Sequence, residues 1–144
     1  MQKLGEVLES GWLWLVARLL LVVVFASSGL AKIIDFDAGM AEMRDAGLEP
    51  AWLFNVVVAS TLLLGSVLIL LDRVVWLAAA ALSGFLLLAI LIVHRFWALP
   101  ASDAELALFF ALEHVSVMGG LIAVAVASHA RRELRLIDEW KPRT

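Results

Sequence analysis

Four long apolar stretches occupy most of this 144-residue chain. They cover residues 12–30, 51–71, 74–93 and 106–128. A helix needs about 20 apolar residues to cross the hydrocarbon core of a bilayer. A soluble domain of this size could not bury a composition that is 63% hydrophobic. The sequence therefore predicts an all-α membrane protein, a four-transmembrane-helix bundle formed by a single domain.

Composition excludes several classes of function. The loops left between the four stretches are too short to form a separate catalytic module, so any chemistry must occur in the bundle or on a partner. The chain has no cysteine, which excludes disulfides, thiol relays and cysteine-ligated clusters. Its formal net charge of −3 argues against a nucleic-acid partner. Glu6 and Glu9 precede the first stretch, so we expect a retained anchor rather than a cleaved signal peptide.

The basic residues predict the orientation, because they collect on the cytoplasmic side of short loops. Both termini of a four-span protein share one side, together with the turn at Asp72 and Arg73. That side holds seven basic residues and the opposite side three: Lys3, Arg73, Arg131, Arg132, Arg135, Lys141 and Arg143 against Lys32, Arg44 and Arg95. We therefore expect cytoplasmic termini, a cytoplasmic tail over residues 129–144 that includes a short interfacial helix, and a multi-pass protein in the inner (plasma) membrane of a bacterium.

The first outer loop carries a helical pattern over residues 36–47. Phe36, Met40 and Met43 recur at helical spacing, with Asp35 or Asp37 as the cap and Gly47 as the stop. The pattern predicts a short interfacial helix on the outer membrane face.

The first span has one polar face. Arg18, Phe25, Gly29 and Lys32 share it at 100° per residue, and we expect this face to point into the bundle. Gly29 would allow a neighbouring helix or a ligand to approach closely. Arg18 lies closer to the inner end of the span, and we expect its side chain to reach the cytoplasmic interface.

The outer half of the membrane holds the other ionisable residues. Glu113 lies about 10 Å below the outer end of the fourth span, while Lys32 and His94 sit at the ends of the first and third. These positions predict one outer polar pocket formed by Lys32, Asp35, His94, Arg95, Trp97, Glu113 and His114.

Glu113 needs an explanation, since a carboxylate at mid-membrane costs about 2.5–3.5 kcal/mol on the insertion scale. One interpretation is structural: Glu113 is protonated, or is held by His94 or Lys32 in a contact between helices. The other is proton handling by Glu113, His114 and His94 at a quinone-like head group. Haem between His94 and His114 is disfavoured because we expect the two residues to lie at different heights. We predict no metal site.

Several of these residues also carry a family resemblance. Arg18-Leu19-Leu20 leading to Phe25, and then the segment from Ser28 to Asp35 (SGLAKIID), resembles the opening signature of the DoxX family. His94-Arg95-Phe96-Trp97 is similar to the histidine and Phe-Trp pattern of the family, and Gly119-Gly120-Leu121 is similar to its glycine-containing close. The resemblance covers about Arg18 to Ser128.

The resemblance implies a four-helix membrane protein that is a quinone-linked redox subunit. The family name is linked to a small subunit of a thiosulfate:quinone oxidoreductase, and to membrane complexes with sulfurtransferase or superoxide dismutase partners. The chain departs from the pattern in its fourth span, where Glu113-His114 stands in place of the Lys-Asn pair of many members.

Three hypotheses follow, in order of preference. The first is a redox subunit that uses Glu113, His114 and His94 for proton transfer and binds quinone with Lys32, Asp35, Arg95, Trp97 and Gly29. The second is a non-catalytic membrane scaffold or assembly factor. The third is a small-solute transporter. Four unbroken spans argue against it, because transporters commonly use broken helices for alternating access. The candidate partners are the lipid bilayer, a soluble or membrane redox protein and a second copy of the chain.

Overall fold

The structure is a computed structural model that describes residues 2–140, all of whose regular elements are helices. Six α-helices and one short 3-10 helix follow one another along the chain. They are α1 (Gln2–Glu9), α2 (Gly11–Ile34), α3 (Phe36–Asp45), α4 (Ala51–Leu70), α5 (Val75–Ile92), η1 (Phe96–Ala98) and α6 (Ala101–Trp140). Helices α2, α4, α5 and α6 are long and apolar enough to cross a membrane, and each overlaps one of the four predicted spans. The fold-class prediction is confirmed, and the chain is a multi-pass membrane protein.

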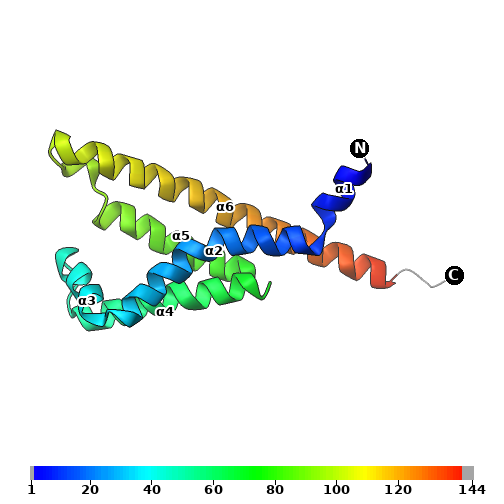
Figure 1. The fold of residues 1–144 in the computed structure, drawn as a ribbon, viewed down its shortest axis with the longest axis horizontal. Helices are drawn as coiled ribbons and strands as arrows, with labels where there is room; N and C mark the ends of the chain where they lie inside the picture. Colours follow the sequence, from blue (N-terminus) through cyan, green and yellow to red (C-terminus); the bar gives the residue numbers. More distant parts are fainter. Residues whose placement is uncertain (1, 141–144) are drawn as a thin grey trace.

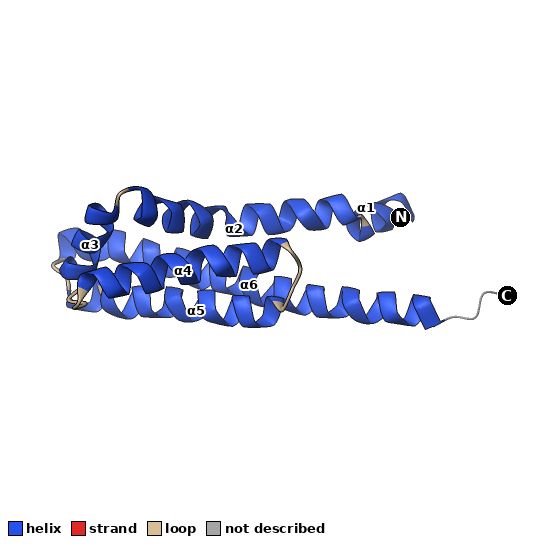
Figure 2. Cartoon of the chain, turned by 90° about the horizontal axis from the view of Figure 1, so that it is seen from below, coloured by secondary structure: helices blue, strands red, loops and turns tan. Residues whose placement is uncertain are grey.

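The molecule has two distinct ends (Figures 1 and 2). Helix α1 and the C-terminal part of α6 lie at one end, here called the terminal end. Helix α3 and the connection between α5 and α6 lie at the other end, here called the loop end. This arrangement agrees with an even number of spans, while the side of the membrane that each end faces stays a prediction.

Helix α6 is longer than predicted. The sequence predicted a span over residues 106–128 followed by a separate tail, but one unbroken helix of 40 residues runs from Ala101 to Trp140. No glycine or proline occurs between Leu121 and Trp140, so nothing in the sequence ends the helix where the apolar stretch ends. The tail up to Trp140 is therefore a continuation of the fourth span, and residues 141–144 lie outside the described residues.

The four spanning helices pack in chain order. Helix α2 packs along α4, α4 along α5, and α5 along α6, whereas α2 and α6 make only a small contact. Within the described residues the backbones of α2 and α5 do not approach each other closely. The arrangement is therefore an open row of helices, and its first and last members are only weakly joined.

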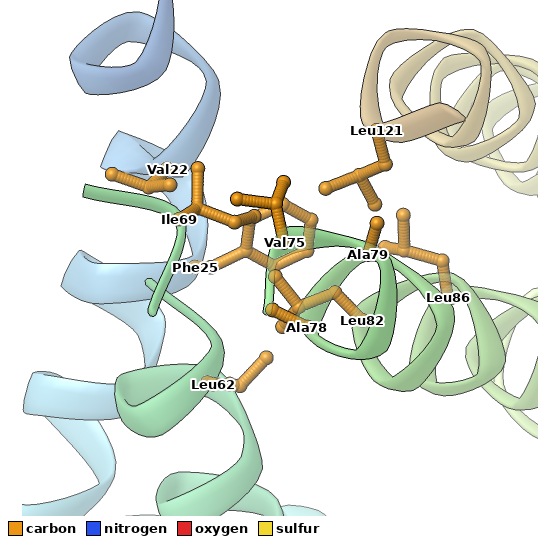
Figure 3. Close-up of a cluster of buried hydrophobic side chains, with 10 residues drawn as sticks. All are labelled: Val22, Phe25, Leu62, Ile69, Val75, Ala78, Ala79, Leu82, Leu86 and Leu121. Carbon is orange, nitrogen blue, oxygen red and sulfur yellow. The ribbon is translucent and has the colours of Figure 1, made fainter. Parts of the chain in front are cut away.

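Side chains from all four helices form the core that joins the row (Figure 3). Phe25 of α2 and Leu121 of α6 reach this cluster from opposite sides, and both are almost fully buried. The cluster consists of Val22, Phe25, Leu62, Ile69, Val75, Ala78, Ala79, Leu82, Leu86 and Leu121. Two glycines allow the close packing, because a Cβ added at Gly29 or Gly65 would lie 2.9 Å from Leu63 Cγ or 2.8 Å from Leu82 Cγ.

The predicted polar face of α2 does point into the protein. Arg18, Phe25, Gly29 and Lys32 are all buried. The Arg18 side chain is buried and reaches the terminal end of α4, and the side of the membrane that this end faces stays a prediction. Its guanidinium donates to the carbonyl oxygens of Ile69 (3.1 Å) and Leu70 (2.8 Å) at the C-terminal end of α4, where the Ile69 carbonyl also accepts from the Asp72 amide. Arg18 therefore caps the neighbouring helix.

Helix α3 begins and ends near the predicted residues, and its position is set by packing. Asp35 Oδ1 accepts a hydrogen bond from the Ala38 amide at 3.0 Å, and Gly47 takes the positive φ of 75° that follows the helix. Asn55 of α4 is fully buried and donates to the Lys32 carbonyl at 3.2 Å. A Cβ added at Gly39 would lie 2.8 Å from Asn55 Cγ, so only glycine lets α3 lie this close to α4. Helix α3 is thus folded back onto α2 and α4.

Asp72 joins three segments at the terminal end. Its carboxylate accepts hydrogen bonds from Trp14 Nε1 at 3.0 Å and Ser128 Oγ at 2.6 Å, and Arg135 lies 3.5 Å away. Burial alone would raise the pKa of Asp72, but the two hydrogen bonds and the charges of Arg18 and Arg135 outweigh it and lower the pKa below its ordinary value. The ionised carboxylate therefore ties the start of α2 and the middle of α6 to the α4–α5 turn.

Candidate functional site

The eight predicted site residues form two groups at the loop end. Gly29, Lys32 and Asp35 belong to α2 and its junction with α3, whereas the other five belong to α5, η1 and α6: His94, Arg95, Trp97, Glu113 and His114. Among the described residues neither α2 nor α3 packs against this second group at the loop end, because the row of helices is open on that side. The structure does not bring the eight residues into one pocket.

The three residues of the first group make contacts within the protein. The Lys32 ammonium is buried and pairs with the Glu42 carboxylate of α3. Asp35 caps α3, and Gly29 lies against Leu63 of α4. These three residues hold α2, α3 and α4 together, which is a structural role.

The second group is centred on two histidines in contact. The rings of His94 and His114 have centroids 5.0 Å apart and meet edge to face at 85°. Phe110, one helical turn before His114, also stacks on His94, with a centroid distance of 5.1 Å and an angle of 29°. His94 follows the last residue of α5 by only two positions, so Phe110 and His114 lie beside the end of α5.

The predicted difference in height between His94 and His114 is wrong. The sequence placed His94 and His114 at different depths, but their rings are in direct contact. The reason is that α6 extends past the end of α5 at the loop end and passes beside η1, which packs on it. Glu113 and His114 are therefore close to the end of the third span. Rings in direct contact leave no space for a haem plane between them, so the arrangement does not favour haem at this pair.

Glu113 lies on the outward face of α6. Its side chain is exposed, and it makes no hydrogen bond or ion pair with another residue of the described chain. The structural interpretation, in which His94 or Lys32 holds Glu113, is not what the structure shows. The carboxyl group points away from the protein, beside the two histidines, where it can meet lipid, water or a bound molecule.

Two aromatic residues of η1 extend the surface around the histidines. Phe96 and Trp97 meet edge to face with centroids 5.0 Å apart, and Trp97 is 57% exposed. Arg95 is also exposed and directly precedes η1. We call His94, Arg95, Trp97, Phe110, Glu113 and His114 the loop-end cluster.

The loop-end cluster combines two imidazoles and a carboxyl group with exposed aromatic faces. Two imidazoles and a carboxyl group can accept or donate protons to a bound carbonyl or hydroxyl. Among residues 2–140, no three His, Asp or Glu side chains lie together as metal ligands would.

Two residues that matter here were missing from the predicted set. Phe110 lies four positions before His114, so helical spacing alone could have indicated that the two share a face. Asn55 is a polar residue inside an apolar stretch, and the reasoning applied to Glu113 applies to it as well. Its buried carbonyl oxygen, Oδ1, has no hydrogen-bond partner among the described residues, and it lies next to Gly39.

Comparison with known proteins gives a family and no individual relative. The family model described as DoxX matches residues 13–95. Neither a curated protein nor a solved structure matches the chain. The match includes Gly29, Lys32 and Asp35 as well as His94 and Arg95, but it ends before Trp97 and α6, so it is shorter than the resemblance seen in the sequence. Since it covers more than half of the 144 residues, the chain belongs to the DoxX family.

Proposed function

We propose that this protein is a membrane subunit of a quinone-linked redox complex and that its loop-end cluster binds the quinone head group. The observation that carries the proposal is the contact of His94 with His114 beside an unpaired, outward-facing Glu113. A group of proton-transferring side chains on the outer surface of a spanning helix is open to a molecule that diffuses within the membrane.

The cluster has the two kinds of surface that a quinone requires. Its carbonyl oxygens need hydrogen-bond donors and a source of protons, which the imidazoles and the Glu113 carboxyl group supply. Its ring and tail need apolar surface, which Phe110 and Trp97 supply at 41% and 57% exposure. Arg95 adds a fixed positive charge at the boundary of the membrane.

The electrons for the reaction come from a partner protein. Reduction of a quinone to a quinol takes up two electrons and two protons, and this chain contributes the protons. A soluble or membrane redox protein supplies the electrons, which agrees with a role as one subunit of a complex. The open side of the helix row gives such a partner direct access to the cluster.

Photolabelling tests the site. The purified protein in mild detergent is irradiated with a short-tailed azidoquinone, digested and analysed by mass spectrometry. We expect the label to concentrate within residues 94–114, and to fall at least five-fold in Glu113→Gln and in His114→Phe. Asp45→Asn is the matched control, because Asp45 is an exposed carboxylate at the same end of the molecule, in α3.

Two outcomes would overturn the proposal. One is label spread evenly over the four spans, which would indicate nonspecific partition into the detergent micelle. The other is label at residues 94–114 that neither substitution lowers, because the two proton-transferring side chains would then have no part in binding.

A second candidate function is a non-catalytic scaffold or assembly factor. The exposed surface of α6 favours it, since Glu113 has no partner in the described chain and, on another face of the helix, a Cβ added at Gly119 meets no atom within 4 Å. A scaffold predicts that Glu113→Gln is tolerated and that changes between Phe36 and Arg44 prevent recovery of a partner. Co-purification of partner proteins with each variant separates the two functions.

A further inference from the structure

A second polar site lies at the terminal end, at the opposite end of the spanning helices from the loop-end cluster. It is a cavity of about 380 Å³ between the α4–α5 turn and α6. This volume falls within the roughly 300–1,000 Å³ that small-molecule sites occupy. The residues that line it are Leu71, Asp72, Arg73, Ser128, Arg132, Arg135 and Leu136.

The lining carries a net positive charge. Three arginines and one aspartate give 3 − 1 = +2. Asp72 is already engaged by Trp14, Ser128 and Arg135, and Arg132 donates to the Asp72 carbonyl at 3.3 Å. These contacts fix two guanidinium groups beside the cavity.

The third arginine of the lining is Arg73. It is exposed, and its side chain makes no hydrogen bond or ion pair with any residue that the structure describes. Its guanidinium is therefore available for a ligand, and guanidinium groups bind phosphate oxygens in a bidentate manner.

The cavity lies where the apolar helix α4 ends, next to Trp14. Trp14, whose indole holds Asp72, also lies under the guanidinium groups of Arg18 and Arg131 at 5.1 and 5.5 Å. Tryptophan and arginine together are typical of the membrane–water interface. The turn that carries Asp72 and Arg73 follows directly on the apolar helix α4.

Two leucines complete the cavity. Leu71 and Leu136 line it and are 61% and 54% exposed. A soluble phosphate would leave this apolar surface in water, whereas the first carbons of lipid acyl chains would cover it. The combination of arginines and exposed leucines fits a ligand with an anionic head and an apolar body.

We infer that this cavity binds the phosphodiester head group of an anionic phospholipid, held by Arg73 with Arg132 and Arg135. The ligand would join the α4–α5 turn to α6, in addition to the contacts that Asp72 already makes. The site is independent of the quinone proposal, since it shares no residue with the loop-end cluster.

Native mass spectrometry tests this site on the intact protein. The protein is delipidated in a neutral detergent and titrated with phosphatidylglycerol, or with phosphatidylcholine of the same acyl chains. We expect phosphatidylglycerol to bind more tightly, and Arg73→Gln to weaken its binding by about five-fold, which is typical for one arginine at an anionic membrane surface. Arg132→Gln should weaken it at least as much.

Controls distinguish a site from general charge attraction. Arg44→Gln removes one positive charge from the exposed surface of α3, at the other end of the molecule, and should leave the affinity for phosphatidylglycerol unchanged. The midpoint of thermal unfolding of Arg73→Gln without lipid should match the wild type, because Arg73 has no partner in the described chain. Equal loss in Arg44→Gln and Arg73→Gln, or no preference between the two lipids, would overturn the inference.

Inorganic phosphate separates the two sources of the anion. If millimolar phosphate raised the unfolding temperature as much as phosphatidylglycerol does, and if Arg73→Gln removed both effects, the cavity would be a site for free phosphate and the lipid assignment would be wrong. We expect phosphate to have little effect, because it leaves Leu71 and Leu136 uncovered.

Discussion

The imidazole rings of His94 and His114 meet edge to face with their centroids 5.0 Å apart, although 20 residues separate them in the chain. The contact joins a residue two positions past the end of α5 to the loop-end part of the spanning helix α6. It places two imidazole side chains at one point on the outer surface of the bundle. Glu113 precedes His114 and faces outward beside them.

Glu113→Gln should lower turnover and leave the stability of the fold nearly unchanged. Because Glu113 has no partner in the described chain, we expect the free energy of unfolding to change by less than about 0.5 kcal/mol. Loss of a general acid–base group should lower quinone-linked turnover by roughly 10²-fold or more. The measurement is thermal unfolding in detergent together with the turnover of a short-chain quinone by membranes that contain the whole complex. A stable variant with full turnover would remove Glu113 from the proton path.

Gly39→Ala should loosen α3. The added Cβ would lie 2.8 Å from Asn55 Cγ, and overpacking of this kind costs about 1–3 kcal/mol. Limited proteolysis between residues 36 and 50, followed over time, would report the release of the helix. Gly119→Ala is the control, since an added Cβ there meets nothing within 4 Å and alanine favours a helix by about 0.5–1 kcal/mol. Equal protection of the two variants would show that α3 does not depend on this contact.

Asp72→Asn should change how stability depends on pH. The pKa of Asp72 in the folded protein is below its ordinary value of 3.8, so the ionised carboxylate stabilises the fold at pH values above 3.8. That contribution is lost as the pH falls through the lowered pKa of the folded state. We expect Asp72→Asn to destabilise the protein by roughly 1–3 kcal/mol at neutral pH, because hydrogen bonds to a charged group are lost, and by much less in strong acid.

Unfolding temperatures of the wild type and Asp72→Asn between pH 3 and pH 7 check this prediction. The difference between the two proteins should shrink toward the acid end of the range. A difference that is constant with pH would mean that the charge of Asp72 contributes nothing and that only its shape matters.

Arg18→Leu should weaken the terminal end of α4. The substitution places an apolar side chain in the buried position and leaves the Leu70 carbonyl oxygen without its side-chain donor, which costs about 1–3 kcal/mol, while the Ile69 carbonyl keeps its bond from the Asp72 amide. Thermal unfolding in detergent measures the loss. Leu20→Ala, at a position of α2 that is 71% exposed, is the control and should have a much smaller effect. If the two variants unfolded alike, Arg18 would not act as a cap.

Local patterns in the sequence predicted the elements correctly. Length and hydropathy identified the four spanning helices, because each must satisfy its backbone hydrogen bonds within itself in the membrane. Helical spacing identified the buried face of α2 at Arg18, Phe25, Gly29 and Lys32, and Asp35 and Gly47 marked the limits of α3. The family resemblance is confirmed over residues 13–95.

The partners of the polar residues could not be predicted in the same way. Lys32 was expected beside Glu113 and pairs with Glu42, and the contact of Arg18 with the end of α4 was not predicted. Both outcomes depend on which helix lies next to α2. Helices α4 and α5 are apolar on all sides, so their sequences do not indicate which face meets which neighbour.

The sequence by itself determined the number of spans, the polar face of the first one and the family, since these follow from composition and spacing along one helix. Only the tertiary structure decided that the predicted pocket is two separate groups and that His94 meets His114. It also decided that Glu113 faces outward. The physical reason is that helices in a membrane associate through close packing at small residues such as Gly29 and Gly65, and the resulting order of the helices fixes which polar side chains meet.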